Sequence, residues 1–145
     1  MIYEDRKTPL IEEKAKKIIG KISSPDDLDP SILQTIPYQY SKRKITTELT
    51  TDEFTCLCPF SGLPDFANIT IEYIPADKLI ELKSLKYYLY SFRNVKIYNE
   101  HAVNRIIEDL KKALRPYQIT VVGEFTSRGG VKNKVTATYK KIGKK

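Results

Sequence analysis

Residues 69–92 read ITIEYIPADKLIELKSLKYYLYSF, and the hydrophobic period changes within this stretch. Apolar and polar residues alternate at its start, which is the pattern of a strand with one buried face. Pro75 ends that alternation. From residue 79 to 92 the apolar residues recur three and four positions apart, as on one face of a helix. The stretch therefore predicts a strand followed by a helix over residues 79–92.

The segments on either side continue these two periods. Upstream, alternation over residues 45–49 predicts an earlier strand, and residues 51–66 are predicted to form a loop. Downstream, an amphipathic helix is predicted from about Asn99, with Pro116 just past its end. The residues predicted to line its solvent-facing side are Arg105, Glu108, Asp109 and Lys112.

Two further strands are predicted near Ile119–Phe125 and Val131–Tyr139, joined by a hairpin turn at Gly129-Gly130. The order strand, strand, helix, helix, strand, strand is typical of the α+β class, with an antiparallel sheet covered by helices on one face. Such a sheet has two exposed edges. Joining copies edge to edge would turn several short sheets into one closed barrel.

The chain is predicted to have three parts. Residues 1–42 contain several prolines and are interpreted as an arm that wraps the domain or a neighbouring subunit, with a short helix from Thr8 to Lys17 or Ile19. Residues 43–140 are predicted to form the main folded domain, and residues 141–145 are predicted to form a basic tail.

Composition excludes several classes of protein. The chain has 145 residues, 41% hydrophobic residues, one His and two Cys, too few for a closed structural zinc site made from these ligands. No apolar run is long enough to cross a membrane, and no secretion signal is visible, so a cytoplasmic protein is expected. The net charge is +7, but residues 128–145 contain seven basic residues and no acidic one. The excess charge therefore indicates at most a local anion site, and no direct contact with nucleic acid is expected.

The stretch over residues 55–66 reads TCLCPFSGLPDF and carries the most reactive side chains. A thiolate is a strong nucleophile, and a desolvated carboxylic acid can donate a proton, so Cys58 and Asp65 fit covalent catalysis with acid assistance. A purely structural interpretation also fits. In that case Cys56 and Cys58 are small buried residues, and Asp65 caps a turn.

Three further groups are candidate binding sites. Lys83 and Lys86 share a helix face and suit phosphates, although a solvated lysine face gives the same pattern. Glu100 suits the N–H groups of a purine-like ring or the helix dipole, and His101 suits proton transfer or an ordinary surface position. Arg128 lies at the hairpin turn, as an anion ligand or a solvated cation.

Taken together, these motifs resemble the QueF family of NADPH-dependent nitrile reductases over about residues 54–139. The motifs that carry the resemblance are Cys58-Pro59 with Asp65, the Glu-x-Lys-x-x-Lys signature within Glu81–Tyr90, Ser91-Phe92-Arg93-Asn94, Glu100 and Arg128-Gly129-Gly130. The resemblance implies a tunnelling fold, rings of five subunits stacked as a decamer, and active sites between subunits. It implies reduction of 7-cyano-7-deazaguanine to 7-aminomethyl-7-deazaguanine with two NADPH, in queuosine biosynthesis.

The resemblance also implies a role for each matched residue. Cys58 is the nucleophile that forms a thioimide, and Asp65 supplies protons. NADPH phosphates are held by Lys83 and Lys86, with Arg128 as a further candidate. The residues implied to bind the base are Ile80, Glu81, Leu82, Asn99 and Glu100.

One departure concerns histidine. Many family members have His just before the anchoring Glu, whereas here that place is Asn99 and His101 follows. His101 is therefore a candidate for proton handling.

Three alternatives remain. A related tunnelling-fold amidinotransferase would act on the cyano group in tRNA, but it has no need of the lysine signature. A zinc-dependent pterin-type relative lacks its His cluster here. A basic module that binds nucleic acid does not account for Cys58 and Asp65.

Overall fold

The computed structural model describes residues 11, 13–14, 17 and 21–143. Within them the predicted order of two strands, two helices and two strands is confirmed, with short elements added. The elements are the 3₁₀ helices η1 (Pro25–Asp27) and η2 (Pro30–Ile32), the strands β1 (Thr35–Pro37), β2 (Thr47–Leu57), β3 (Pro64–Ile74), β4 (Lys78–Ile80), β5 (Gln118–Arg128) and β6 (Val131–Lys140), and the helices α2 (Leu82–Tyr90) and α3 (Asn99–Leu114).

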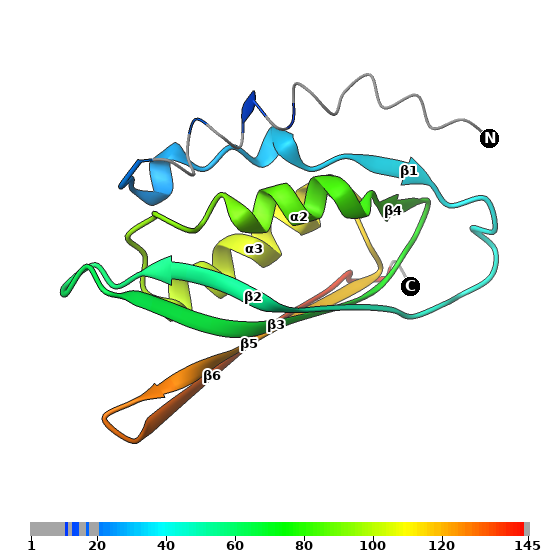
Figure 1. Ribbon diagram of the computed structural model, residues 1–145. Helices are drawn as coiled ribbons and strands as arrows, with labels where there is room; N and C mark the ends of the chain where they lie inside the picture. The colour runs from blue at the N-terminus through cyan, green and yellow to red at the C-terminus, as the bar shows by residue number, and fades with distance from the viewer. Residues whose placement is uncertain (1–10, 12, 15–16, 18–20, 144–145) are drawn as a thin grey trace.

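The main sheet has four antiparallel strands in the order β2-β3-β5-β6, so that β2 and β6 are its edges. Both helices lie on one side of this sheet, and residues 21–37 cross the other side of the helices (Figure 1). A second, two-stranded sheet pairs β1 with β4. The predicted α+β class and antiparallel sheet are confirmed, whereas closure of several copies into a barrel remains a prediction.

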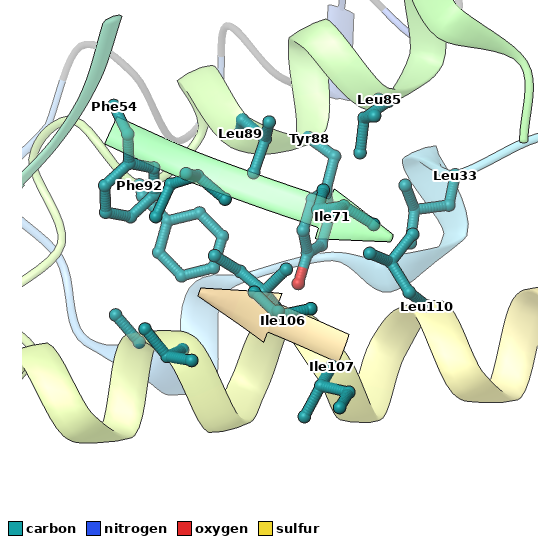
Figure 2. Packing of buried hydrophobic residues seen from close by; sticks show 14 of the residues in the cluster. Leu33, Phe54, Ile71, Leu85, Tyr88, Leu89, Phe92, Ile106, Ile107 and Leu110 are labelled. Carbon is teal, nitrogen blue, oxygen red and sulfur yellow. The ribbon is translucent and has the colours of Figure 1, made fainter. Parts of the chain in front are cut away.

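The core lies between the sheet and the helices, where side chains from both layers interleave (Figure 2). The apolar stripe predicted for the first helix is buried at each of its positions: Leu85, Tyr88, Leu89 and Phe92. At Gly123, α3 lies very close to the sheet. A Cβ added to this glycine would lie only 2.7 Å from Val103 Cγ2 on the helix. The bare backbone at Gly123 therefore allows α3 to lie directly on β5.

The loop predicted over residues 51–66 is confirmed only for residues 58–63, because β2 runs to Leu57 and β3 begins at Pro64. The pairing register shifts between Thr51 and Phe54, where β2 carries one extra residue. Such a bulge moves the buried side chains from odd to even positions, so the alternation that marks a strand is broken in the sequence.

The helix predicted over residues 79–92 is also shorter than expected. Leu79 and Ile80 belong to β4, and α2 starts at Leu82. Glu81 caps this helix, since its carboxylate accepts hydrogen bonds from the backbone N–H of Lys83 and Ser84 at 2.9 and 2.7 Å.

Asp109 was predicted to face solvent on α3, and this was wrong, since its side chain is buried. Its Oδ2 accepts from the Tyr88 hydroxyl at 2.6 Å and from Arg105 Nε at 2.8 Å. Burial, followed by the nearby Asp109 charge, raises the pKa of Tyr88 well above its ordinary value. Arg105 also donates to the carbonyls of Pro25 and Leu28, so this buried network ties the N-terminal segment to both helices.

The predicted helix from Thr8 to Lys17 or Ile19 falls largely outside the described residues, as do the last two lysines of the predicted tail. The division into an arm, a domain and a tail therefore remains a prediction. No helix in the described part of the chain is long and apolar enough to cross a membrane.

Candidate functional site

Cys58 lies immediately after β2, in the tight turn that leads into β3. Its N–H donates to the carbonyl of Leu63 at 2.9 Å, and its carbonyl accepts from the N–H of Gly62 at the same distance. Gly62 has a φ of 71°, a conformation that favours glycine. These bonds close the turn, so Cys58 is held beside the start of β3, where Asp65 is the second residue.

The thiol of Cys58 is activated by its own turn. Hydrogen bonding by the Ser61 side chain and backbone lowers the pKa of Cys58, while the negative charge of Asp65 acts in the opposite direction. The backbone N–H of Ser61 lies 3.5 Å from Cys58 Sγ. A part-exposed thiol with a lowered pKa has the properties of a nucleophile.

Cys56 has the opposite character, although it is only two residues away. Its side chain is fully buried on β2, with Sγ 4.0 Å from the carbonyl of Ile97. Burial, together with the charges of Asp65 and Cys58, raises the pKa of Cys56 to about 12. Both thiols are free, and the geometry gives reactivity to Cys58 rather than to Cys56.

Asp65 forms an ion pair with Arg128, with Oδ1 2.8 Å from Nε. The Arg128 guanidinium also donates to the carbonyl of Pro64 through Nη2. Because β5 lies beside β3, its end comes close to Asp65, and the β5–β6 register shifts between Phe125 and Arg128. This bulge helps to aim Arg128 at the start of β3.

The start of α3 is brought to the same end of the sheet by the segment before it. The N–H of Leu57 donates to the carbonyl of Val95, and the N–H of Ile97 donates to the carbonyl of Leu57, at 2.9 and 3.0 Å. This short parallel pairing places the entry to α3 beside the end of β2 and therefore near Cys58.

Three predicted residues lie on the first turn of α3. Glu100 Oε1 accepts from the Asn133 side-chain amide at 3.1 Å, and the His101 ring lies against the Tyr98 ring with centroids 5.7 Å apart. Asn99 Oδ1 is buried and has no hydrogen-bond partner in the described part of the chain. An unpaired buried acceptor suits a ligand that brings an N–H donor.

Asn133 was not found from the sequence. It lies on β6 among alternating polar residues, and only the pairing of β6 with β5 brings it near the start of α3. Asn133 could have been found only if the pairing register of β5 and β6 had been known.

The remaining predicted residues gather at the start of α2. Ile80 is buried, Leu82 is 60% exposed, and the Glu81 carboxylate is occupied by the helix cap. Lys83 and Lys86 lie on the first two turns of the helix. Cations near the N-terminus of a helix attract anions together with the helix dipole.

A groove of about 340 Å³ lies between α2 and the edge strand β2. Leu82, Lys86 and Tyr90 line its helix side, and Thr50 and Thr51 are among its strand residues. The Lys86 ammonium lies 5.0 Å from the centroid of the Tyr87 ring. An apolar groove with a lysine in its wall can hold a planar ring that carries phosphate groups.

One chain does not bring the two groups of residues together. Asp65 lies at the start of β3 and α2 begins beyond its other end, and eleven residues of strand span about 35 Å. Figure 1 shows the β2–β3 turn and the start of α2 at opposite ends of the molecule. Within one chain, the start of α2 therefore lies far from Asp65.

A metal site is not apparent in the described residues, where no three His, Cys, Asp or Glu side chains are grouped to hold an ion.

Comparison with known proteins identifies close relatives. A family model described as QueF-like protein matches residues 64–144. A protein from Caldicellulosiruptor bescii, named NADPH-dependent 7-cyano-7-deazaguanine reductase, is 53% identical over 80% of this chain and 88% of its own length. Proteins of the same name from Thermoanaerobacter pseudethanolicus and Chloroherpeton thalassium are 48% and 46% identical, over 80% and 77% of this chain and 87% and 97% of their own lengths.

A solved structure shares the fold. It is the apo form of an archaeosine synthase described as QueF-Like, with a TM-score of 0.63 and 24% identity, covering 68% of this chain and 96% of that one. At this identity the likeness concerns the fold alone.

Proposed function

The chain belongs to the QueF-like family, and on that premise we propose that it is an NADPH-dependent reductase that converts 7-cyano-7-deazaguanine into 7-aminomethyl-7-deazaguanine. The observation that carries the chemistry is the part-exposed Cys58, whose pKa is lowered by Ser61, beside the carboxyl group of Asp65. Relatives that are 46–53% identical carry the reductase name, whereas the archaeosine synthase of 24% identity shares only the fold, so the reductase is favoured over an amidinotransferase.

The first step is the attack of the Cys58 thiolate on the nitrile carbon. A C–S bond forms, one π bond of the nitrile breaks, and the nitrogen takes a proton supplied through Asp65, which gives a thioimide. Two NADPH molecules, bound in turn, would each supply one hydride. The first hydride adds to the thioimide carbon, and the C–S bond then breaks, which returns the Cys58 thiolate and leaves an imine. The second hydride adds to the imine carbon while the nitrogen takes one more proton, which gives the amine. Cys58 holds the carbon in one place for the first reduction, and a closed site protects the imine from water.

The substrate is anchored at the start of α3. Glu100 accepts hydrogen bonds from the ring and amino N–H groups of the deazaguanine. Asn99 Oδ1, which has no partner in the described chain, accepts one more N–H from the base. Ile80, Glu81 and Leu82 of a second copy line the other side of the base. His101 is the candidate for further proton handling.

The residues of α2 fit the cofactor. NADPH carries several negative charges and two flat rings, and α2 offers Lys83 and Lys86 beside an apolar groove. Arg128 is the third cation that we assign to the phosphates.

The separation of the two groups supports an assembly in which each site forms between copies. We propose rings of five subunits stacked as a decamer, with β2 and β6 edges paired into a closed barrel, in the cytoplasm.

Mass spectrometry after incubation with 7-cyano-7-deazaguanine alone tests the covalent step. A mass increase equal to one substrate is expected in the wild-type chain and in Cys56→Ala, and not in Cys58→Ala. An adduct that survives in Cys58→Ala would refute the assignment of the nucleophile.

A further inference from the structure

Arg128 is already engaged in the free chain. Its guanidinium contacts the start of β3 twice, at Asp65 Oδ1 and at the carbonyl of Pro64. The Asp65 side chain is only 12% exposed, whereas the Arg128 side chain is 43% exposed. The pair therefore lies at the rim of the site, with the carboxylate inside and the cation within reach of solvent.

The hairpin that carries Arg128 has room to move it. Arg128 is the last residue of β5, and the turn after it consists of Gly129 and Gly130, with φ values of 57° and 79°. A Cβ at either glycine would meet no atom of the described chain within 4 Å, so the side-chain positions of both glycines are open. The turn also projects beyond the helices, away from the core (Figure 1).

The Arg128 guanidinium has two anionic partners available to it, Asp65 and a phosphate of bound NADPH. If Arg128 binds a phosphate of NADPH, its Nε can no longer be devoted to Asp65. If Arg128 stays on Asp65, that carboxylate oxygen is not available to the nitrogen of the substrate. One cation between two anions is shared or exchanged, and the two anions then compete.

We propose that Arg128 exchanges between Asp65 and a phosphate of NADPH, so that binding of the cofactor releases the carboxyl group of Asp65 toward the substrate. This inference rests on the proposed function, because it requires NADPH as the ligand. The ion pair is accessible to solvent, and pairs of this kind are weak enough to be exchanged. Through Arg128, the binding of NADPH would therefore make the Asp65 carboxyl group available as a proton donor.

Competition has a direct thermodynamic consequence. Removal of the Asp65 charge frees Arg128, so Asp65→Asn is expected to bind NADPH about two- to fivefold more tightly, which matches the usual strength of an exposed ion pair. This gain must pass through Arg128. It therefore disappears in a chain that lacks the guanidinium.

The test is a double-mutant cycle read by the fluorescence of bound NADPH, with the assembled full-length protein. The variants are wild type, Asp65→Asn, Arg128→Gln and the double variant. We expect tighter binding in Asp65→Asn, weaker binding in Arg128→Gln, and no effect of Asp65→Asn in the Arg128→Gln background. Arg128→Met, which also removes the charge but keeps a long side chain, replaces the Gln variant if that variant does not fold.

Glu124→Gln is the matched control, because it removes a negative charge of β5 that faces Lys134 at 3.6 Å and not Arg128. The exchange would be overturned if Asp65→Asn raised the affinity for NADPH equally in the wild-type and Arg128→Gln backgrounds. Such a result would mean that the Asp65 charge acts on NADPH at a distance and not through Arg128. Unchanged affinity in Asp65→Asn would also overturn it. If the folded wild-type chain does not bind NADPH, the proposed cofactor is wrong, and the exchange is wrong with it.

Discussion

Cys56 and Cys58 are two positions apart, and the chain gives them opposite chemistry. The bulge in β2 turns Cys56 into the core, where burial raises its pKa to about 12. Cys58 lies just past the strand, in a turn whose Ser61 lowers its pKa. Local backbone geometry, rather than the Cys-x-Cys-Pro spacing, therefore separates a thiol with a raised pKa from a thiol with a lowered pKa.

Ser61 offers a test of that separation. In Ser61→Ala the side-chain hydrogen bond to Cys58 is lost, so the pKa of Cys58 is expected to rise and its alkylation by iodoacetamide at neutral pH to slow. The pH dependence of alkylation, measured in a Cys56→Ser background, gives the midpoint. Ser127→Ala, on the exposed end of β5, is the control. An unchanged midpoint in Ser61→Ala would show that the turn does not activate the thiol.

At the scale of elements, the sequence predicted what is periodic and missed what interrupts a period. Both helical stripes and the order of the elements follow from spacings that the core requires. The extension of β2 was hidden by its bulge, and Glu81, as the N-cap, makes the helix start later than predicted. Asp109 was placed in solvent because the sequence does not show that Tyr88 and Arg105 meet it in the core.

The candidate site was also predicted only in part. Cys58, Asp65 and Glu100 could be singled out by chemistry and by resemblance, and the structure places them at one end of the sheet. Asn133 and the Asp65–Arg128 pair depend on strand register, which the sequence alone does not determine.

The contact between α3 and β5 depends on Gly123. In Gly123→Ala the new Cβ would lie 2.7 Å from Val103 Cγ2 and 2.9 Å from the Phe125 ring, so a loss of about 1–3 kcal/mol of stability is expected. Urea unfolding measures it. Gly143→Ala, where a Cβ meets nothing within 4 Å, is the control and should be neutral. Val103→Ala should recover part of the loss in the Gly123→Ala background. Equal stability of both glycine variants would contradict the close approach.

At the scale of the whole molecule, the proposed site is divided between copies. In the proposed assembly, one copy would supply the thiol and its carboxyl partner, and the other would supply the lysines of α2. Two variants with defects in different halves should therefore complement each other when they assemble together. Mixed assemblies of Cys58→Ala and Lys86→Ala are expected to regain activity, with about a quarter of the sites built from two intact halves if assembly is random.

The control for this experiment is a mixture of Cys58→Ala and Asp65→Asn, which carry defects in the same half. Every site in that mixture keeps one defect, so it should remain inactive. Failure of the first mixture to recover, with both variants assembled, would mean that each site is complete within one chain.

The proposed reaction itself is tested most directly by the absorbance of NADPH in the presence of 7-cyano-7-deazaguanine. The wild-type protein should oxidise two NADPH for each nitrile consumed and yield the aminomethyl product, whereas Cys58→Ala should oxidise none. Folded, assembled wild-type protein that binds both ligands and leaves the NADPH absorbance unchanged would contradict the assignment as a nitrile reductase.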